Sequence, residues 1–322
     1  MTASKIEWTD RSDWNPVRGC TRVSPGCGGP GDHGGCYAEG MAARFSKPGQ
    51  WGHGFAEMKS GRPRWTGKVA VAEDRVTLPL RWRKPAKVFV SSTSDVFHEA
   101  LRDEAIDRIF AVMALCPHLT FQILTKRPDR MRDYMSPYSS RRADSLGTKV
   151  VALGYQEPLE HLRWPLPNVW LGTSVENRGV IGRIDELRAT AAAVRFISFE
   201  PLLGTLGNID FSGIHWAIVG GESGPRARPT HPDWVRSLRD QCLAAKVPFL
   251  FKQWGEWAPC EKVRCSEGHD HRVNQLPAGF RFDDARRYQI MDGEGIEWAK
   301  VGKKDAGREL DGAVWSEFPA AT

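Results

Sequence analysis

The sequence predicts an α/β protein built on a partial or complete (β/α) barrel of parallel strands. Short apolar runs recur along the chain, and each ends in a burst of polar residues. Amphipathic helical patterns lie between them, as connections between parallel strands require. Such a barrel gathers its reactive groups at the carboxyl ends of its strands. An open doubly wound sheet obeys a similar rule and is the alternative fold.

Apolar runs without strict alternation are typical of strands that are buried on both faces. The six predicted strands are residues 88–90, 121–124, 169–172, 196–199, 216–219 and 249–251. Apolar residues spaced by three and four indicate helices over 101–115 and 232–245. Thr230 or His231 is placed to cap the second helix, and Pro232 suits its first turn.

We expect one barrel-like catalytic domain over residues 1–257 and a C-terminal extension over 258–322, packed on or beside it. Two segments interrupt the strand and helix pattern at about 46–85 and 136–168. The first is rich in Gly, Trp and Arg and predicts a cap or substrate-facing insertion. Beyond Trp257 the pattern gives way to an irregular, Gly-rich and charged tail.

The charge balance favours an anionic partner. The chain of 322 residues has 45 Lys+Arg against 39 Asp+Glu, a net charge of +6, and a pI near 9.0. Lys and Arg cluster at several places, such as 81–87 and 126–132, and a solvated surface is the other explanation for each cluster. The first ten residues lack an apolar signal core, and no apolar run has membrane-spanning length. We therefore expect a cytoplasmic protein with reduced thiols and no membrane association.

Three cysteines near the start of the chain predict a metal centre. Six residues separate Cys20 from Cys27 and eight separate Cys27 from Cys36, many of them glycine. Three thiolates can hold a [4Fe-4S] cluster and leave one iron free to bind a cofactor. Zinc is the alternative, because His33 supplies a fourth ligand for a closed structural site. Incidental thiols are the third possibility.

A second group near the C-terminus has weaker metal-ligand spacing. It consists of Cys260, Cys265, His269 and His271. Because its spacings depart from common zinc patterns, a loop with ordinary polar residues is the alternative interpretation.

Several motifs carry a family resemblance. The runs DWNPV at 13–17, SPGC at 24–27 and CYA at 36–38, with others at 94–98, 124–128, 200–203, 220–225 and 251–255, resemble the phage-associated three-Cys-motif family, named after phage gene products thirty-seven and sixty-eight. The cysteine loop and strand order are also similar to radical S-adenosylmethionine enzymes of the spore photoproduct lyase type. The second cysteine gap, at eight residues, is longer than the two usual in the family.

The resemblance implies roles around the cofactor. Cys20, Cys27 and Cys36 would be cluster ligands, and Tyr37 would cover the cluster or contact adenine. Ser92, Ser94 and Asp95 follow a strand where related folds bind the amino group of S-adenosylmethionine. Glu222 would contact ribose hydroxyls. The alternatives are a buried aromatic for Tyr37, helix capping for Ser94 or Asp95, and a tight turn at Glu222.

Charged residues at the strand ends are the substrate-facing candidates. Glu176 and Glu200 are expected to bind substrate or move a proton. Lys126, with Arg127 and Lys252, would hold the cofactor carboxylate or a substrate phosphate. A buried salt bridge between one of the glutamates and Lys126 or Lys252 is the alternative.

These observations favour a radical S-adenosylmethionine enzyme that modifies or repairs nucleic acid or a nucleotide-like anionic substrate. An electron donor or another partner protein would serve it. Two other classes stay open: a zinc-stabilised nucleic-acid-binding protein without catalysis, and a metal-dependent hydrolase using the carboxylates at the strand ends.

Overall fold

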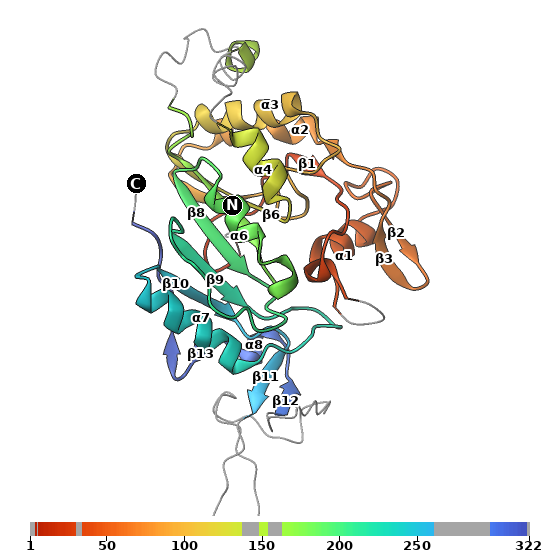
Figure 1. The fold of residues 1–322 in the computed structure, drawn as a ribbon. Coiled ribbons are helices and arrows are strands. Elements are labelled where there is room, and N and C mark those ends of the chain that lie inside the picture. The colour runs from red at the N-terminus through yellow and green to blue at the C-terminus, as the bar shows by residue number, and fades with distance from the viewer. Residues whose placement is uncertain are drawn as a thin grey trace, which may run out of the picture.

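The six apolar runs form one parallel sheet in the computed structural model, which describes residues 4, 6–29, 34–136, 148–153, 163–260 and 297–320. The sheet curls into a half-barrel (Figure 1), and its strands follow chain order. The predicted α/β partial barrel is thus confirmed, since a doubly wound sheet would reverse its strand order. The strands are β5 (Ala86–Val90), β6 (Leu119–Thr125), β7 (Val169–Ser174), β8 (Val194–Phe199), β9 (Trp216–Gly220) and β10 (Phe249–Gln253).

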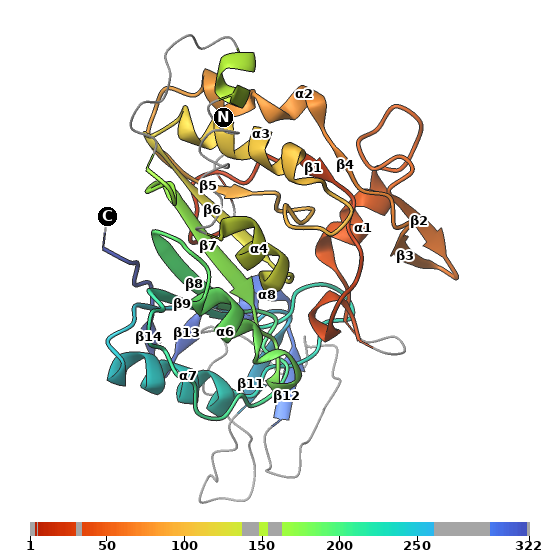
Figure 2. The same ribbon diagram turned by 45° about the horizontal axis from the view of Figure 1, so that its top comes forward.

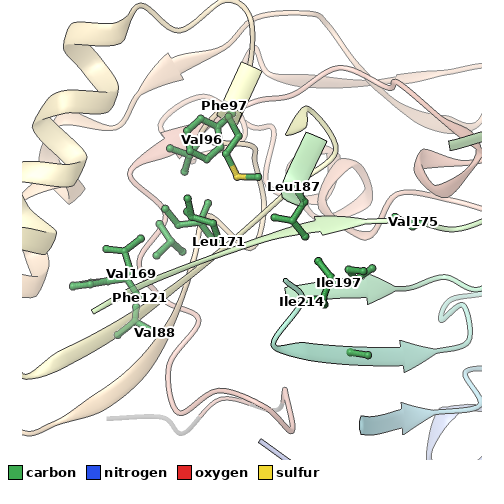
Figure 3. Close-up of a cluster of buried hydrophobic side chains, with 14 of the residues drawn as sticks. Val88, Val96, Phe97, Phe121, Val169, Leu171, Val175, Leu187, Ile197 and Ile214 are labelled. Atoms are coloured by element: carbon green, nitrogen blue, oxygen red, sulfur yellow. The ribbon is translucent and has the colours of Figure 1, made fainter. Parts of the chain in front are cut away.

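Helices cover one face of the sheet. They are α3 (Asp103–Ala114), α4 (Pro128–Met135), α6 (Arg183–Arg188) and α7 (Pro232–Ala244). Their apolar side chains share one buried cluster with alternate strand residues such as Val88, Phe121 and Leu171 (Figure 3). Burying each such side chain contributes roughly 1.5–3 kcal/mol. This burial accounts for every second apolar residue of the strands, since successive side chains point to opposite faces.

Both predicted helices are confirmed as α3 and α7. The side chain of His231 caps α7, accepting a hydrogen bond from the backbone N–H of Asp233 at 3.1 Å. Pro232 occupies the first turn, where its missing N–H costs nothing. The cap and the apolar stripe together explain where this helix begins and which face it buries.

A second, aromatic cluster fills the other face of the sheet. It includes Trp8, Trp170, Phe196 and Trp216. The ring of Trp216 lies 6.1 Å from that of Trp8 and 5.1 Å from that of Phe318. Segments from both ends of the chain therefore meet inside the half-barrel.

Part of the segment before β5 forms a layer beside the sheet. After the short turn η1 (Pro25–Cys27) and helix α1 (Tyr37–Arg44), a hairpin of β2 (Ala56–Lys59) and β3 (Arg62–Trp65) packs next to α1 (Figure 2). The expected insertion at 46–85 holds this hairpin. It also contains three more short elements, which are β4 (Ala70–Val71), α2 (Glu73–Val76) and η2 (Leu78–Arg81). Strand β4 pairs with β1 (Val17–Arg18).

The described C-terminal residues return to the sheet. β11 (Trp257–Cys260) pairs with β12 (Glu297–Lys300), and β13 (Glu309–Leu310) with β14 (Ala313–Val314). Along the chain, helix α8 (Lys303–Ala306) lies between β12 and β13. Ser316 forms an antiparallel bridge to Leu250 of β10. The second segment expected to interrupt the pattern spans about 136–168, and its residues 137–147 and 154–162 lie outside the described residues. The short turn η3 (Arg178–Val180) follows β7.

Candidate metal centre at the carboxyl end of the half-barrel

The three cysteines lie within electrostatic reach of one another. Burial raises the pKa of the Cys20 thiol to about 12, and the charges of Asp95, Cys36 and Cys27 raise it as well. Burial also raises the pKa of Cys36, to which Cys27 adds, while the charge of Lys126 opposes the shift. All three are free thiols. The chain therefore brings three sulfur donors to one place.

This donor set fits an iron–sulfur cluster or zinc. Thiolates suit both, and a four-iron cluster binds each sulfur on a different iron, so its ligands stand apart. A single zinc ion instead needs every sulfur about 2.3 Å from one point. No group of three or more His, Cys, Asp and Glu side chains within the described ranges already has the arrangement for an ion. His33, the fourth ligand in the zinc alternative, lies outside those ranges.

The second predicted metal group is described only at its edge. Cys260 is the last residue of β11. Cys265, His269 and His271 lie outside the described residues.

Residues 20–29 and 34–36 are here called the cysteine segment. Glu176 anchors this segment to the end of β7. Its Oε1 accepts the backbone N–H of Gly26 at 2.9 Å, and its Oε2 accepts Arg183 Nη1 at 3.0 Å. The carboxylate is fully buried. A Cβ on Gly26 would lie 2.9 Å from the Glu176 carboxyl carbon and 3.2 Å from Lys126 Cε. A larger residue at this position would therefore displace the ends of the Glu176 and Lys126 side chains.

Glu222 anchors the same segment to the end of β9. Its Oε1 accepts the backbone N–H of Gly35 at 3.3 Å, beside Cys36. Arg228 pairs with both carboxylate oxygens, at 2.7 and 2.8 Å, and donates to the carbonyl of Pro25 at 3.0 Å. One buried ion pair thus holds the segment at two points.

Arg127 holds the beginning of the cysteine segment. Its Nη2 donates to Thr21 Oγ1 at 2.7 Å, and its Nη1 lies 3.8 Å from Cys20 Sγ. Asp95 Oδ2 accepts the same Nη1 at 3.0 Å. Arg127 also binds Glu99, and this hydrogen bond holds the pKa of Glu99 at about 2 although burial opposes it. A buried cation therefore faces the sulfur of Cys20.

The predicted cofactor residues after β5 bind the protein itself. The Ser92 hydroxyl donates to the carbonyl of Ser12 at 3.1 Å, and that of Ser94 to the carbonyl of Val17 at 2.8 Å. Asp95 accepts the Thr125 hydroxyl at 2.8 Å and the backbone N–H of Phe97 at 3.0 Å. Asp95 caps no described helix. These three residues tie β5 to the N-terminal segment and to Arg127.

Three further candidates, Lys126, Glu200 and Lys252, lie at the carboxyl end of the sheet, and Tyr37 begins α1. Lys126 Nζ donates to Ser174 Oγ at 3.2 Å, at the end of β7. Lys252 Nζ and Glu200 Oε1 form an ion pair at 2.6 Å, which is the salt-bridge alternative for Glu200. Tyr37 is 70% exposed and so is not a buried aromatic.

The sequence did not single out Glu39, which proves to be a structural centre of the site. Its carboxylate is buried, pairs with Arg22 and accepts the backbone N–H of Trp65 at 2.8 Å. A carboxylate three residues after Cys36, in the first turn of α1, was the available signal. Arg183 and Arg228 were missed as well, because their spacings from Glu176 and Glu222, seven and six positions, are not those of neighbouring side chains on a helix.

Comparison with known proteins identifies the class of chain without an activity. Residues 3–319 match a family described as a protein of unknown function, DUF5131. The chain therefore belongs to the DUF5131 family. No curated protein and no solved structure matches it. Among the described residues, no helix has the length and apolar character needed to cross a membrane.

Proposed function

We propose that this protein is an iron–sulfur enzyme of the radical S-adenosylmethionine type, acting on nucleic acid or a nucleotide-like anionic substrate. The observation that carries the proposal is that the segment bearing the three cysteines is held against the carboxyl end of a half-barrel, through Thr21, Gly26 and Gly35. Reactive groups of parallel (β/α) folds gather at this end. A structural zinc loop needs no such position.

Cys20, Cys27 and Cys36 would hold the cluster. When bound, a three-cysteine cluster with S-adenosylmethionine supplies a radical able to abstract hydrogen, and the protein supplies placement and electrostatics. Arg127 lies against the Cys20 sulfur, and Lys126 lies near Cys36. Both cations offset the negative charge of thiolates, which stabilises an anionic centre in a buried site.

We expect substrate to be bound by the charged groups at the strand ends that do not hold the cysteine segment. Glu200, Lys252 and Lys126 meet this condition, whereas Glu176 and Glu222 are engaged as anchors. The Glu200 and Lys252 pair can accept a substrate hydroxyl or a phosphate. An electron donor would be required for turnover.

The test is anaerobic reconstitution with iron and sulfide, followed by reduction in the presence of S-adenosylmethionine. We expect a brown protein that forms 5′-deoxyadenosine, and a Cys20/Cys27/Cys36→Ala variant that forms none. Stoichiometric zinc in a colourless anaerobic preparation would contradict the proposal and favour a zinc-stabilised binding protein.

A further inference from the structure

Two short segments of this chain are strongly basic. Residues 75–87 contain five Lys and Arg and no acidic residue. Residues 44–68, here called the basic segment, contain six Lys and Arg but one acidic residue, Glu57. Their net charge is +5, of the +6 carried by the whole chain. The other 297 residues are thus nearly neutral, with 39 basic and 38 acidic side chains. A solvated surface with mixed charges would not show this imbalance.

The basic side chains of this segment are available to a partner. Arg44, Lys47, Lys59 and Lys68 are exposed, and no described residue forms an ion pair with any of them. In both ribbon views the β2–β3 hairpin forms an outer edge of the molecule, with α1 on its inner side (Figures 1 and 2). The hairpin tip is thus reachable by a large ligand.

The basic segment is fixed at two points to residues that flank the cysteine segment. The backbone N–H of Trp65 donates to the buried carboxylate of Glu39, in the helix that follows Cys36. Three residues further along, the carbonyl of Lys68 approaches Gly19 so closely that a Cβ on Gly19 would lie 2.0 Å away. Gly19 precedes Cys20, so the basic segment forms a wall beside the candidate metal centre.

An exposed aromatic side chain begins the helix against which this wall packs. Tyr37 directly follows Cys36, is the first residue of α1 and is 70% exposed. The β2–β3 hairpin contacts α1. An exposed ring beside clustered cations is the combination with which proteins bind single-stranded nucleic acid, because cations follow the backbone and rings stack on bases.

We infer that the basic segment and Tyr37 form a binding surface for single-stranded nucleic acid. This surface guides the nucleic acid toward the three cysteines. This inference names the substrate class of the proposed function and rests on it for turnover, but binding itself requires no cluster. Lys47, Lys59 and Lys68 contact phosphates, and Tyr37 stacks on a base.

The test compares two charge-reversal variants of the full chain. K47E/K59E/K68E alters the basic segment, and R83E/K84E/K304E makes the same change of charge at exposed residues elsewhere. Binding of a fluorescent single strand of about 16 nucleotides is followed by anisotropy at two salt concentrations. We expect the first variant to bind at least about tenfold more weakly and to lower the salt slope by about 2, as three lost phosphate contacts predict.

The control variant should bind within about threefold of the wild type, and Tyr37→Ala should weaken binding about tenfold through lost stacking. Equal losses in both triple variants would overturn the inference, because only net charge would then matter. Equally tight binding of a duplex, with no effect of Tyr37→Ala, would overturn the single-strand assignment. Tighter binding of phosphatidylserine vesicles than of the strand would assign the surface to membranes instead.

Binding is measured before and after reconstitution, so that the two proposals fail separately. A protein that binds the single-stranded nucleic acid but forms no 5′-deoxyadenosine would contradict the proposed function and support the binding surface. A chain that forms 5′-deoxyadenosine but binds no strand would overturn the surface alone.

Discussion

Buried carboxylates at this site act as anchors because backbone N–H groups and guanidinium groups surround them. Glu176 and Glu222 each accept one N–H from the cysteine segment and one arginine. Removing such a buried charge is costly, because its countercharge then lies unpaired in the interior. These residues therefore position the segment that carries the cysteines, and their predicted roles toward substrate and cofactor stay predictions.

Removing the Glu176 carboxylate should destabilise the protein strongly. Glu176→Leu leaves Arg183 buried without its countercharge and Gly26 without its acceptor, so we expect a loss of about 3–5 kcal/mol in the free energy of unfolding. Asp185→Asn is the matched control, since Asp185 pairs with Arg188 at the surface and should cost less than about 1 kcal/mol. Urea unfolding measures both, and equal losses would contradict the anchor.

The core thiol of Cys242 should make stability sensitive to alkaline pH. Burial, with the charge of Glu317, raises its pKa from 9.0 to about 12. Because the folded pKa is the higher one, this contribution is fully present below pH 9 and is lost as pH rises toward 12. A tenfold difference in proton affinity between the folded and unfolded states corresponds to about 1.4 kcal/mol. The stability difference between wild type and Cys242→Ala should therefore shrink over this range in urea unfolding.

Cys116 provides the comparison for this pH dependence. Burial raises its pKa to about 11, so its stabilising contribution should vanish over a narrower range. Cys116→Ala should thus show a smaller change with pH than Cys242→Ala. Identical pH profiles for the two variants would contradict burial as the cause.

At the scale of elements, the last strand depends on a segment that the sequence pattern describes as irregular. Phe249 of β10 donates its backbone N–H to Glu317 Oε2 at 2.9 Å, and the Glu317 carbonyl accepts Trp216 Nε1 at 2.9 Å. The ring of Phe318 then packs against that of Trp216. The C-terminal segment thus closes the aromatic face of the half-barrel.

Phe318→Ala should expose this aromatic face. Loss of a partly buried ring should cost about 1–3 kcal/mol and shift tryptophan emission to longer wavelength, because water reaches Trp216. Val314→Ala is the control, since Val314 is 54% exposed and should change stability by less than about 0.5 kcal/mol. Unchanged emission in Phe318→Ala would show that Trp216 is covered by other groups.

At the scale of the whole molecule, the fold and the cysteine centre are separable. The two main buried clusters contain Cys116 and Cys242 but neither Cys20, Cys27 nor Cys36. The sheet is stabilised by apolar burial, which is independent of metal. The fold should therefore survive loss of the metal centre.

The Cys20/Cys27/Cys36→Ala variant should keep the far-UV circular dichroism spectrum of the wild type. Its urea unfolding free energy, compared with the metal-free wild-type chain, should fall by no more than about 2 kcal/mol. An unfolded variant would show that the sulfur atoms carry part of the core.

Much of the fold could be predicted because apolar periodicity is a local property of the chain. The runs at 121–124 and 169–172 lie within β6 and β7, and the stripe at 232–245 became α7 with its His231 cap. Spacing and glycine content likewise pointed to the three cysteines. The predicted roles of Ser92 and Tyr37 toward a cofactor stay predictions.

The sequence by itself determined the kind of elements, their order and the set of sulfur donors. Only the tertiary structure decided which charged groups hold those donors, such as Glu176 through Gly26, 150 positions apart along the chain. Curling six parallel strands brings their carboxyl ends together, and the pairing of side chains there depends on distances in space. No local pattern records those distances, because the chain between the partners can have any length that the fold accommodates.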